Sequence, residues 1–194
     1  MQTNLSSELF TQHPIAWTLI LSFLIGLMYA MRAIKKEKDV FIENPTLVEF
    51  GPYILKTPGW WSITSTTDSS IRFERTDTRY DWYAEFFLSD LTHESDVIEE
   101  FKEEIHKRSL LFDEDAGVIH QPLSMKKEAL EHSDIARVEG TATQNGIERV
   151  YFDAMLAFDR DLNKRIWAES KSSVLNGLVE GPYFEYVIQN LKRI

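Results

Sequence analysis

The side chains that could bind a metal ion are sparse and poorly spaced in this chain. Glu103 and His106 have the i, i+3 spacing of the ligands in di-iron helical bundles. Such a site needs a second motif of this kind and two further carboxylates from neighbouring helices, and the sequence supplies neither. Residues 113–115 (Asp-Glu-Asp) lack the spacing and the glycine of an EF-hand loop. We therefore interpret both as solvated surface.

Catalytic motifs are equally absent from the sequence. It contains no G-x-S-x-G, no P-loop and no G-x-G-x-x-G. It has no cysteine, which excludes disulfides and a thiol nucleophile. His93, His120 and His132 lie far apart in the chain, although a Ser-His-Asp arrangement does not require adjacent residues. We expect a non-enzymatic protein with no catalytic, cofactor-binding or metal-binding residues.

Aromatic residues are the strongest candidates for a binding surface. Five of them crowd two neighbouring segments of predicted strand and are the candidate partner-binding residues: Trp60, Trp61, Tyr80, Trp82 and Tyr83. In a strand, the adjacent Trp60 and Trp61 would point to opposite faces. One of them then lies outside the core, where aromatic side chains are enriched at interface hot spots. The alternative is that helices or the membrane surface cover them.

An apolar segment near the N-terminus sets the location of the protein. Residues 14–31 are eighteen consecutive uncharged residues, at the lower limit for a helix that spans a bilayer. Trp17 and Tyr29 lie near its two ends, where aromatic rings favour the membrane interface. A buried core helix is one alternative. A cleaved signal peptide is another, but the first thirteen residues contain no Lys or Arg.

Basic residues on one side of this segment predict its orientation. Arg32, Lys35, Lys36 and Lys38 follow the apolar run, and no basic residue precedes it. Positive flanks stay in the cytoplasm, so we expect the N-terminus outside and the globular domain inside the inner (plasma) membrane. A domain on the periplasmic or external side is the alternative. The same cluster could also bind anionic lipid headgroups.

The rest of the chain is acidic. After Asp39 it has 17 Lys and Arg against 28 Asp and Glu, a net charge of −11. Nucleic acid and anionic lipid would repel such a domain. We therefore expect a membrane span and other subunits of a membrane complex as partners, and no nucleic acid.

The pattern of strands and helices predicts an α+β fold. Alternating apolar residues indicate strands at 60–65, 71–75, 82–88, 135–142, 147–158 and 164–172, with Asn145-Gly146 as a hairpin turn. Asp96 can cap a helix that ends near residue 108, and Gly181-Pro182 can begin a final one. This order predicts an antiparallel sheet flanked by helices. The expected parts are a polar tail (1–13), a transmembrane helix (14–34), a charged neck (35–46) and the globular domain (47–194).

The globular part resembles a known family. Pro58-Gly59-Trp60, the strands after it, the amphipathic helix, the hairpins and the closing helix are similar to the PsbP-like α/β/α sandwich, over residues 47–194. That family includes the extrinsic PsbP subunit of photosystem II and DcrB-type bacterial envelope proteins. Many members are exported and carry a lipoprotein or transit signal where this chain has its apolar segment. The resemblance implies a small accessory or adaptor protein.

These observations lead to two functional hypotheses. The first is a non-enzymatic single-pass membrane protein that acts as an accessory or assembly subunit of a larger membrane complex through its acidic domain. The second is a membrane-tethered module that binds a small apolar or lipid ligand in a cleft between the sheet and a helix. A hydrolase, with Ser or Asp near a His in a pocket, is a distant third.

Overall fold

The computed structural model describes residues 14–76, 81–92, 96–114, 116–120, 122, 130 and 132–194. The predicted polar tail (1–13) lies outside the described residues. The chain forms two compact units, Met1–Asn44 and Pro45–Ile194.

The first unit contains the helix α2, Pro14–Glu43. Its 30 residues correspond to a length of about 45 Å, more than the about 30 Å of a bilayer's hydrocarbon core. Its apolar window has a mean hydropathy of 1.8 and is entirely unburied, so the helix is long and apolar enough to span a membrane. The helix also continues through most of the segment that the sequence assigned to a charged neck.

The second unit is built on two antiparallel sheets. The small sheet has the order β1-β2-β11, and the large sheet has the order β3-β4-β5-β10-β9-β8-β6, with β7 also paired to β8. The small sheet consists of β1 (Thr46–Phe50), β2 (Tyr53–Thr57) and β11 (Lys192–Arg193). The large sheet consists of β3 (Ser62–Thr66), β4 (Ser70–Glu74), β5 (Trp82–Asp90), β6 (Leu110–Phe112), β7 (Ile119–His120), β8 (Ser133–Gln144), β9 (Glu148–Asp159) and β10 (Lys164–Ser172).

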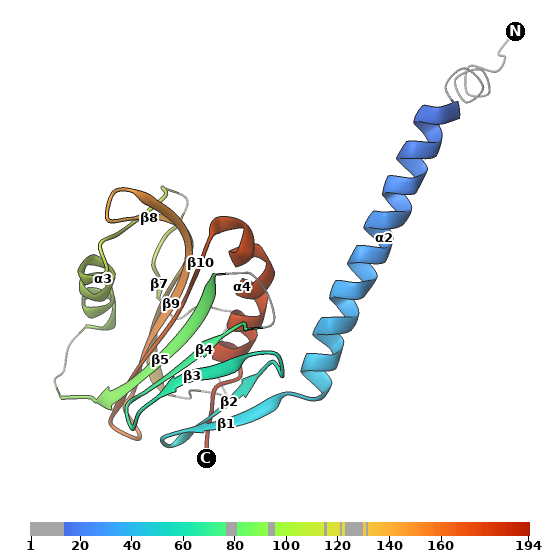
Figure 1. Ribbon diagram of the computed structural model, residues 1–194. Coiled ribbons are helices and arrows are strands. Elements are labelled where there is room, and N and C mark those ends of the chain that lie inside the picture. The colour runs from blue at the N-terminus through green and yellow to red at the C-terminus, as the bar shows by residue number, and fades with distance from the viewer. Residues whose placement is uncertain are drawn as a thin grey trace, which may run out of the picture. The chain divides into compact units, whose positions relative to one another are not determined.

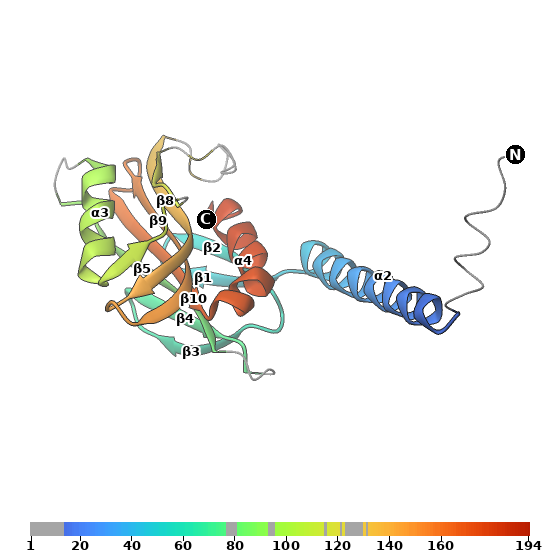
Figure 2. The same cartoon turned by 90° about the horizontal axis from the view of Figure 1, so that it is seen from above.

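Two helices lie on opposite faces of the large sheet (Figures 1 and 2). α3 (Val97–Lys107) packs on β6, β8 and β9, and α4 (Val174–Gln189) packs on β5, β9 and β10 and on β2 of the small sheet. The predicted fold class, an α+β antiparallel sheet flanked by helices with an N-terminal helix able to span a membrane, is confirmed.

Local signals placed α3 and the β8–β9 hairpin correctly. The carboxylate of Asp96 accepts hydrogen bonds from the backbone N–H of Ile98 (2.8 Å) and Glu99 (3.0 Å), as an N-cap should. Asn145 and Gly146 both have positive φ, which the predicted tight turn requires.

The start of α4 differs from the prediction. The helix begins at Val174, after the extended residue Ser173, and Pro182 lies in its interior although the ring removes a backbone donor there. A Cβ at Gly177 would lie 2.1 Å from the Tyr151 ring, and one at Gly181 would lie 3.3 Å from it. The two glycines let the first part of the helix lie close against β9. This packing, which is remote in sequence, extends the helix ahead of its proline.

Candidate partner-binding surface

The face of the large sheet on the α3 side changes from charged to apolar along one row of paired residues. Arg72 on β4 pairs with Glu85 on β5, and Glu85 in turn pairs with Glu169 on β10. The same row continues through Ala154 on β9 to Val138 on β8. Paired residues of neighbouring strands share a face. This row is therefore charged on β4, β5 and β10 and apolar on β9 and β8.

α3 covers the apolar half. Phe101 of α3 is fully buried, and its ring centroid lies 5.4 Å from that of Trp167. Both belong to a core cluster with Leu156 and Ala136. This half is a hydrophobic core that depends on α3.

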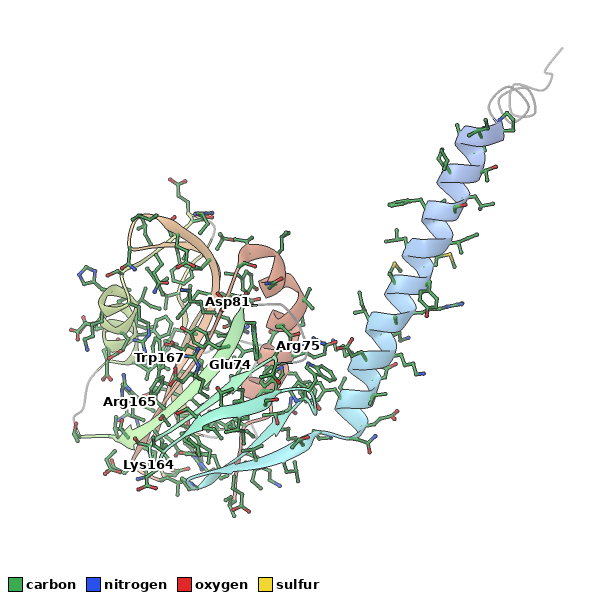
Figure 3. The ribbon with its side chains drawn as sticks, viewed as in Figure 1. Glu74, Arg75, Asp81, Lys164, Arg165 and Trp167 are labelled. Atoms are coloured by element: carbon green, nitrogen blue, oxygen red, sulfur yellow. The ribbon has the colours of Figure 1, made fainter. Side chains whose placement is uncertain are left out.

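The charged half is what we call the open face, defined by Arg72, Glu74, Tyr83, Glu85, Arg108 and Glu169. Among the described helices, none packs over β4 and β5 on this side, because α3 packs on β6, β8 and β9. The side chains of Arg72 and Glu74 remain 32% and 38% exposed. Figure 3 labels Glu74 on β4, and Arg165 and Trp167 on β10.

Arg72 is fixed at the centre of the strands β4 and β5. Its Nε donates to Glu74 at 2.7 Å, and a terminal nitrogen contacts Glu85 at 3.4 Å. Its guanidinium carbon lies 3.9 Å from the centroid of the Tyr83 ring, within the range of a cation–π contact. The guanidinium is therefore held over an aromatic ring, and its side chain still reaches solvent.

Arg108, the C-cap residue of α3, lies at the boundary between the charged half and the apolar half of this face. Its side chain donates to Glu169 and to Glu104, each at 2.6 Å, and lies 4.2 Å above the Trp167 ring. The indole of Trp167 also donates to Glu169 at 2.6 Å. Burial lowers the pKa of Arg108, but Glu169 and Glu104 outweigh it and raise that pKa. This arginine stays charged.

Two further groups of the open face have shifted pKa values. Burial raises the pKa of Glu85, although Arg72 opposes the shift. Burial also raises the pKa of the Tyr83 hydroxyl, and nearby Glu169 adds to the effect. Tyr83 is therefore neutral at physiological pH, and its hydroxyl donates to Glu169 at 3.5 Å.

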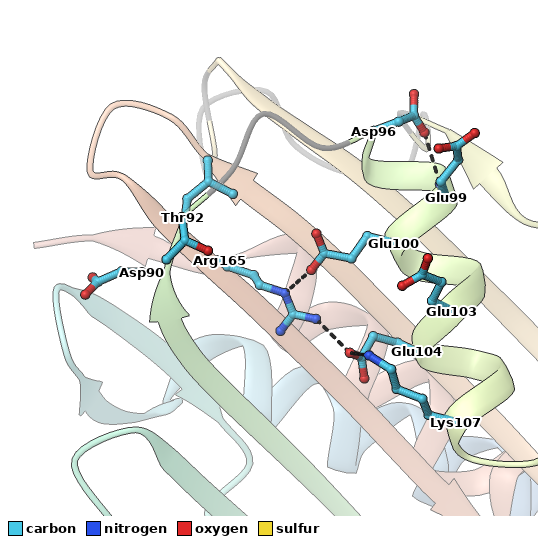
Figure 4. A pocket seen from close by; sticks show the side chains of 10 residues that line it. Asp90, Thr92, Asp96, Glu99, Glu100, Glu103, Glu104, Lys107 and Arg165 are labelled. Atoms are coloured by element: carbon cyan, nitrogen blue, oxygen red, sulfur yellow. Dashed lines mark hydrogen bonds and ion pairs between the residues drawn. The ribbon is translucent and has the colours of Figure 1, made fainter.

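An acidic groove lies along α3, between this helix and the ends of β5 and β10 (Figure 4). It has a volume of about 430 Å³ and is lined by Asp90, Leu91, Thr92, Asp96, Glu99, Glu100, Glu103, Glu104, Lys107 and Arg165. Arg165 forms ion pairs with Glu100 and with Glu104, the latter at 3.3 Å. Arg165 and Glu169 lie on the same face of β10, so the groove and the open face lie on the same side of the large sheet.

A second charged cluster lies on the opposite, α4 side of the sheet, and we call it the sealed cluster. Arg137 on β8 donates to both carboxylate oxygens of Asp153 on β9, at 3.0 and 2.8 Å. It also contacts Glu185 of α4 at 3.0 Å and Glu139 at 2.9 Å. The Asp153 side chain is fully buried. Burial raises the pKa of Asp153 to about 7, although Arg137 opposes the shift.

Two of the five predicted aromatic residues lie in the core. Trp61 and Trp82 are 7% and 2% exposed, and their rings lie 4.5 Å apart in the core. Their indole nitrogens donate to Glu180 (3.2 Å) and Ser170 (3.0 Å). These two candidate partner-binding residues are therefore buried on the α4 side of the sheet, as in the alternative that helices cover the aromatic residues. Tyr80 lies outside the described residues.

Trp60 and Tyr83 remain accessible in part. Trp60 is half-buried, with its ring 5.1 Å from that of Tyr183. Both Trp60 and Trp61 precede β3, so the alternation expected of a strand does not apply to them. Tyr83 lies on the open face, and its partner-binding role stays a prediction.

The remaining predicted residues lie on the helices α2 and α3 or outside the described residues. The anchor residues Trp17, Tyr29, Arg32, Lys35, Lys36 and Lys38 all lie on α2. Among the described residues, no group of three or more Asp, Glu or His side chains could hold a metal ion. Glu103 and His106 are exposed on α3, whereas His93 and Asp115 lie outside the described residues.

Sequence reasoning did not identify Arg108 and Glu169 as parts of this surface. Their contact joins positions 61 residues apart. The only local signal was the polar register of the strands, with Arg72 and Glu74 alternating with apolar neighbours.

Comparison with known proteins places the globular unit in a structural class. It has the PsbP-like fold, an α/β/α sandwich, as the resemblance implied. No family model matches the chain, and no curated protein matches its sequence. The solution structure of cyanobacterial PsbP (CyanoP) from Synechocystis sp. PCC 6803 matches with 9% identity and a TM-score of 0.51, over 78% of this chain and 92% of that one.

Two further solved structures are similar at a lower level. The Ran-binding protein Mog1p from Saccharomyces cerevisiae matches with 9% identity and a TM-score of 0.45, over 76% of this chain and 87% of that one. A Pseudomonas aeruginosa protein of unknown function matches with 11% identity and a TM-score of 0.45, over 78% of this chain and 98% of that one. At these identities the likeness concerns the fold alone.

Proposed function

We propose that this protein is a non-enzymatic, single-pass membrane protein that acts as an accessory or assembly subunit of a larger membrane complex. The observation that carries the proposal is the open face. One half of a sheet face lacks a helical cover in the described structure, and its side chains are nevertheless held in fixed positions.

The composition of the open face supports protein binding. Arg and Tyr are among the residues enriched at interface hot spots, and Arg72 stacked on Tyr83 places both in one rigid unit. Ion pairs with Glu74 and Glu85 hold the guanidinium in position before any partner arrives. Little side-chain entropy would then be lost on binding.

The alternative, an apolar or lipid ligand, receives less support. Small-molecule sites are usually lined by apolar and aromatic side chains. Eight of the ten residues that line the acidic groove are instead charged. The groove suits a cationic group better than an acyl chain.

The membrane anchor supports the proposed location. Arg32, Lys35, Lys36 and Lys38 on α2 favour a cytoplasmic position for the residues that follow the apolar segment, by the positive-inside rule. We therefore propose that the globular unit lies on the cytoplasmic side of the inner membrane. Gly117→Cys, in a chain without cysteine, should be labelled by a membrane-impermeant maleimide only after the cells are opened. Labelling of intact cells would reverse this orientation.

Site-directed crosslinking in native membranes tests the proposed function. A photo-crosslinking amino acid replaces Glu74 on the open face, and a control replaces Glu49, which is exposed on β1 of the small sheet. We expect a single membrane protein, identified by mass spectrometry, to be attached at position 74 and not at position 49. Equal labelling from both positions, or a partner-free monomer after mild-detergent purification, would contradict the proposal.

A further inference from the structure

The surface formed by the open face and the acidic groove carries a strong imbalance of charge. Six of the groove's lining residues are acidic and two are basic. The whole chain after Asp39 has a net charge of −11. A partner that covers this surface needs the opposite sign, because like charges placed across an interface are strongly unfavourable.

The basic side chains of the groove are already engaged. Arg165 is paired with Glu100 and Glu104, and Lys107 is paired with Glu104 at 3.0 Å. Glu99 and Glu103 lie one turn apart on the exposed side of α3. Among the described residues, neither has an ion pair. These two carboxylates are the ones that can pair with cations from outside.

We infer that the open face, with its acidic groove, docks a Lys- and Arg-rich segment of a membrane protein on the cytoplasmic side. This inference rests on the proposed function. Cytoplasmic loops of membrane proteins are enriched in Lys and Arg close to the bilayer. A tethered acidic domain meets such loops at high effective concentration. Cationic side chains of the loop then enter the groove beside Glu99 and Glu103.

Other occupants fit the surface less well. Anionic lipid and nucleic acid have the same sign of charge as the domain. A divalent cation needs several convergent oxygen ligands, and the described residues provide no such group. A basic protein segment is therefore the occupant that the charges favour.

Peptide binding to the full-length protein tests the inference. The protein is placed in nanodiscs of zwitterionic lipid, and the probe is a fluorescent arginine-rich peptide with Gly-Ser spacers. Its glutamate counterpart is the control peptide. We expect the arginine peptide alone to bind, with an affinity that falls as salt rises.

A matched pair of charge reversals locates the binding. Glu103→Lys changes the groove, and Glu49→Lys makes the same change of net charge on the small sheet. We expect Glu103→Lys to weaken binding about tenfold and Glu49→Lys less than about twofold. Unchanged circular dichroism of both variants shows that they fold.

Three results would overturn the inference. The first is no binding of the arginine peptide, the second is equal weakening by both reversals, and the third is displacement of the peptide by Mg²⁺ or Ca²⁺ at levels far too low to screen charge. If crosslinking from position 74 still attaches a membrane protein in any of these cases, the proposed function stands and the partner's chemistry is different.

Discussion

The two charged clusters of this domain use similar residues in opposite ways. The sealed cluster on the α4 side joins Arg137 to Asp153, with exposures of 6% and 0%. The open face on the α3 side joins Arg72 to Glu74 and Glu85, all of which reach solvent. Both fix an arginine between carboxylates of adjacent strands. They differ in whether a helix covers them.

That difference predicts two roles. A buried ion pair is costly to break because the remaining charge has no access to water. An exposed pair contributes little to stability because water and salt replace it. We therefore expect the sealed cluster to hold α4 on the sheet and the open face to serve binding.

The largest expected effect comes from Arg137→Met. It leaves the buried carboxylate of Asp153 without its bidentate partner and frees Glu185 of α4. We expect the free energy of unfolding to fall by about 3–5 kcal/mol. Urea unfolding of the full-length protein in detergent, followed by the fluorescence of the buried tryptophans, measures it. A loss as small as that expected for Arg72→Ala on the open face would show that the cluster is not sealed.

A pH titration gives an intermediate effect. Burial raises the pKa of Asp153 from 3.8 to about 7, so the folded protein retains a proton that the unfolded chain has released. Its contribution to stability is complete below about pH 4 and is lost as pH rises through about 7. Relative to Asp153→Asn, the wild type should lose on the order of 1–3 kcal/mol between pH 4 and pH 8. Parallel stability curves for the two proteins would contradict this.

The smallest effect on stability is expected on the open face. Arg72→Ala removes the ion pairs with Glu74 and Glu85 and the contact with Tyr83. Because these groups reach solvent, unfolding should change by no more than about 1 kcal/mol. The same variant should lose the membrane-protein adduct formed from position 74. A stable variant that keeps the full yield of adduct would remove Arg72 from the binding surface.

Much of the fold followed from local sequence signals. The cap at Asp96, the turn at Asn145-Gly146 and the alternation along β4 depend on neighbouring residues, so the sequence predicted them. The start of α4 depends on Gly177 packing on Tyr151, which no local pattern reveals. The prediction that began the helix at Gly181 therefore missed its first two turns.

The candidate surface was harder to predict for the same reason. Arg108, at the end of α3, meets Glu169 on β10 only after the sheet has formed. Trp61 and Trp82 are candidate partner-binding residues by their crowding in the sequence, but both are buried on the α4 side of the sheet. Tyr83, next to Trp82, reached the open face because strand neighbours alternate.

Hydroxyl-radical footprinting tests the central claim, which is that a partner protein covers the open face when the protein is in its native membrane. Modification of Tyr83 is compared between native membranes and the purified full-length protein. Ile147 at the β8–β9 turn, 88% exposed, is the internal control. We expect Tyr83 to be several-fold less reactive in native membranes while Ile147 is unchanged. Equal reactivity of Tyr83 in both preparations would contradict the account.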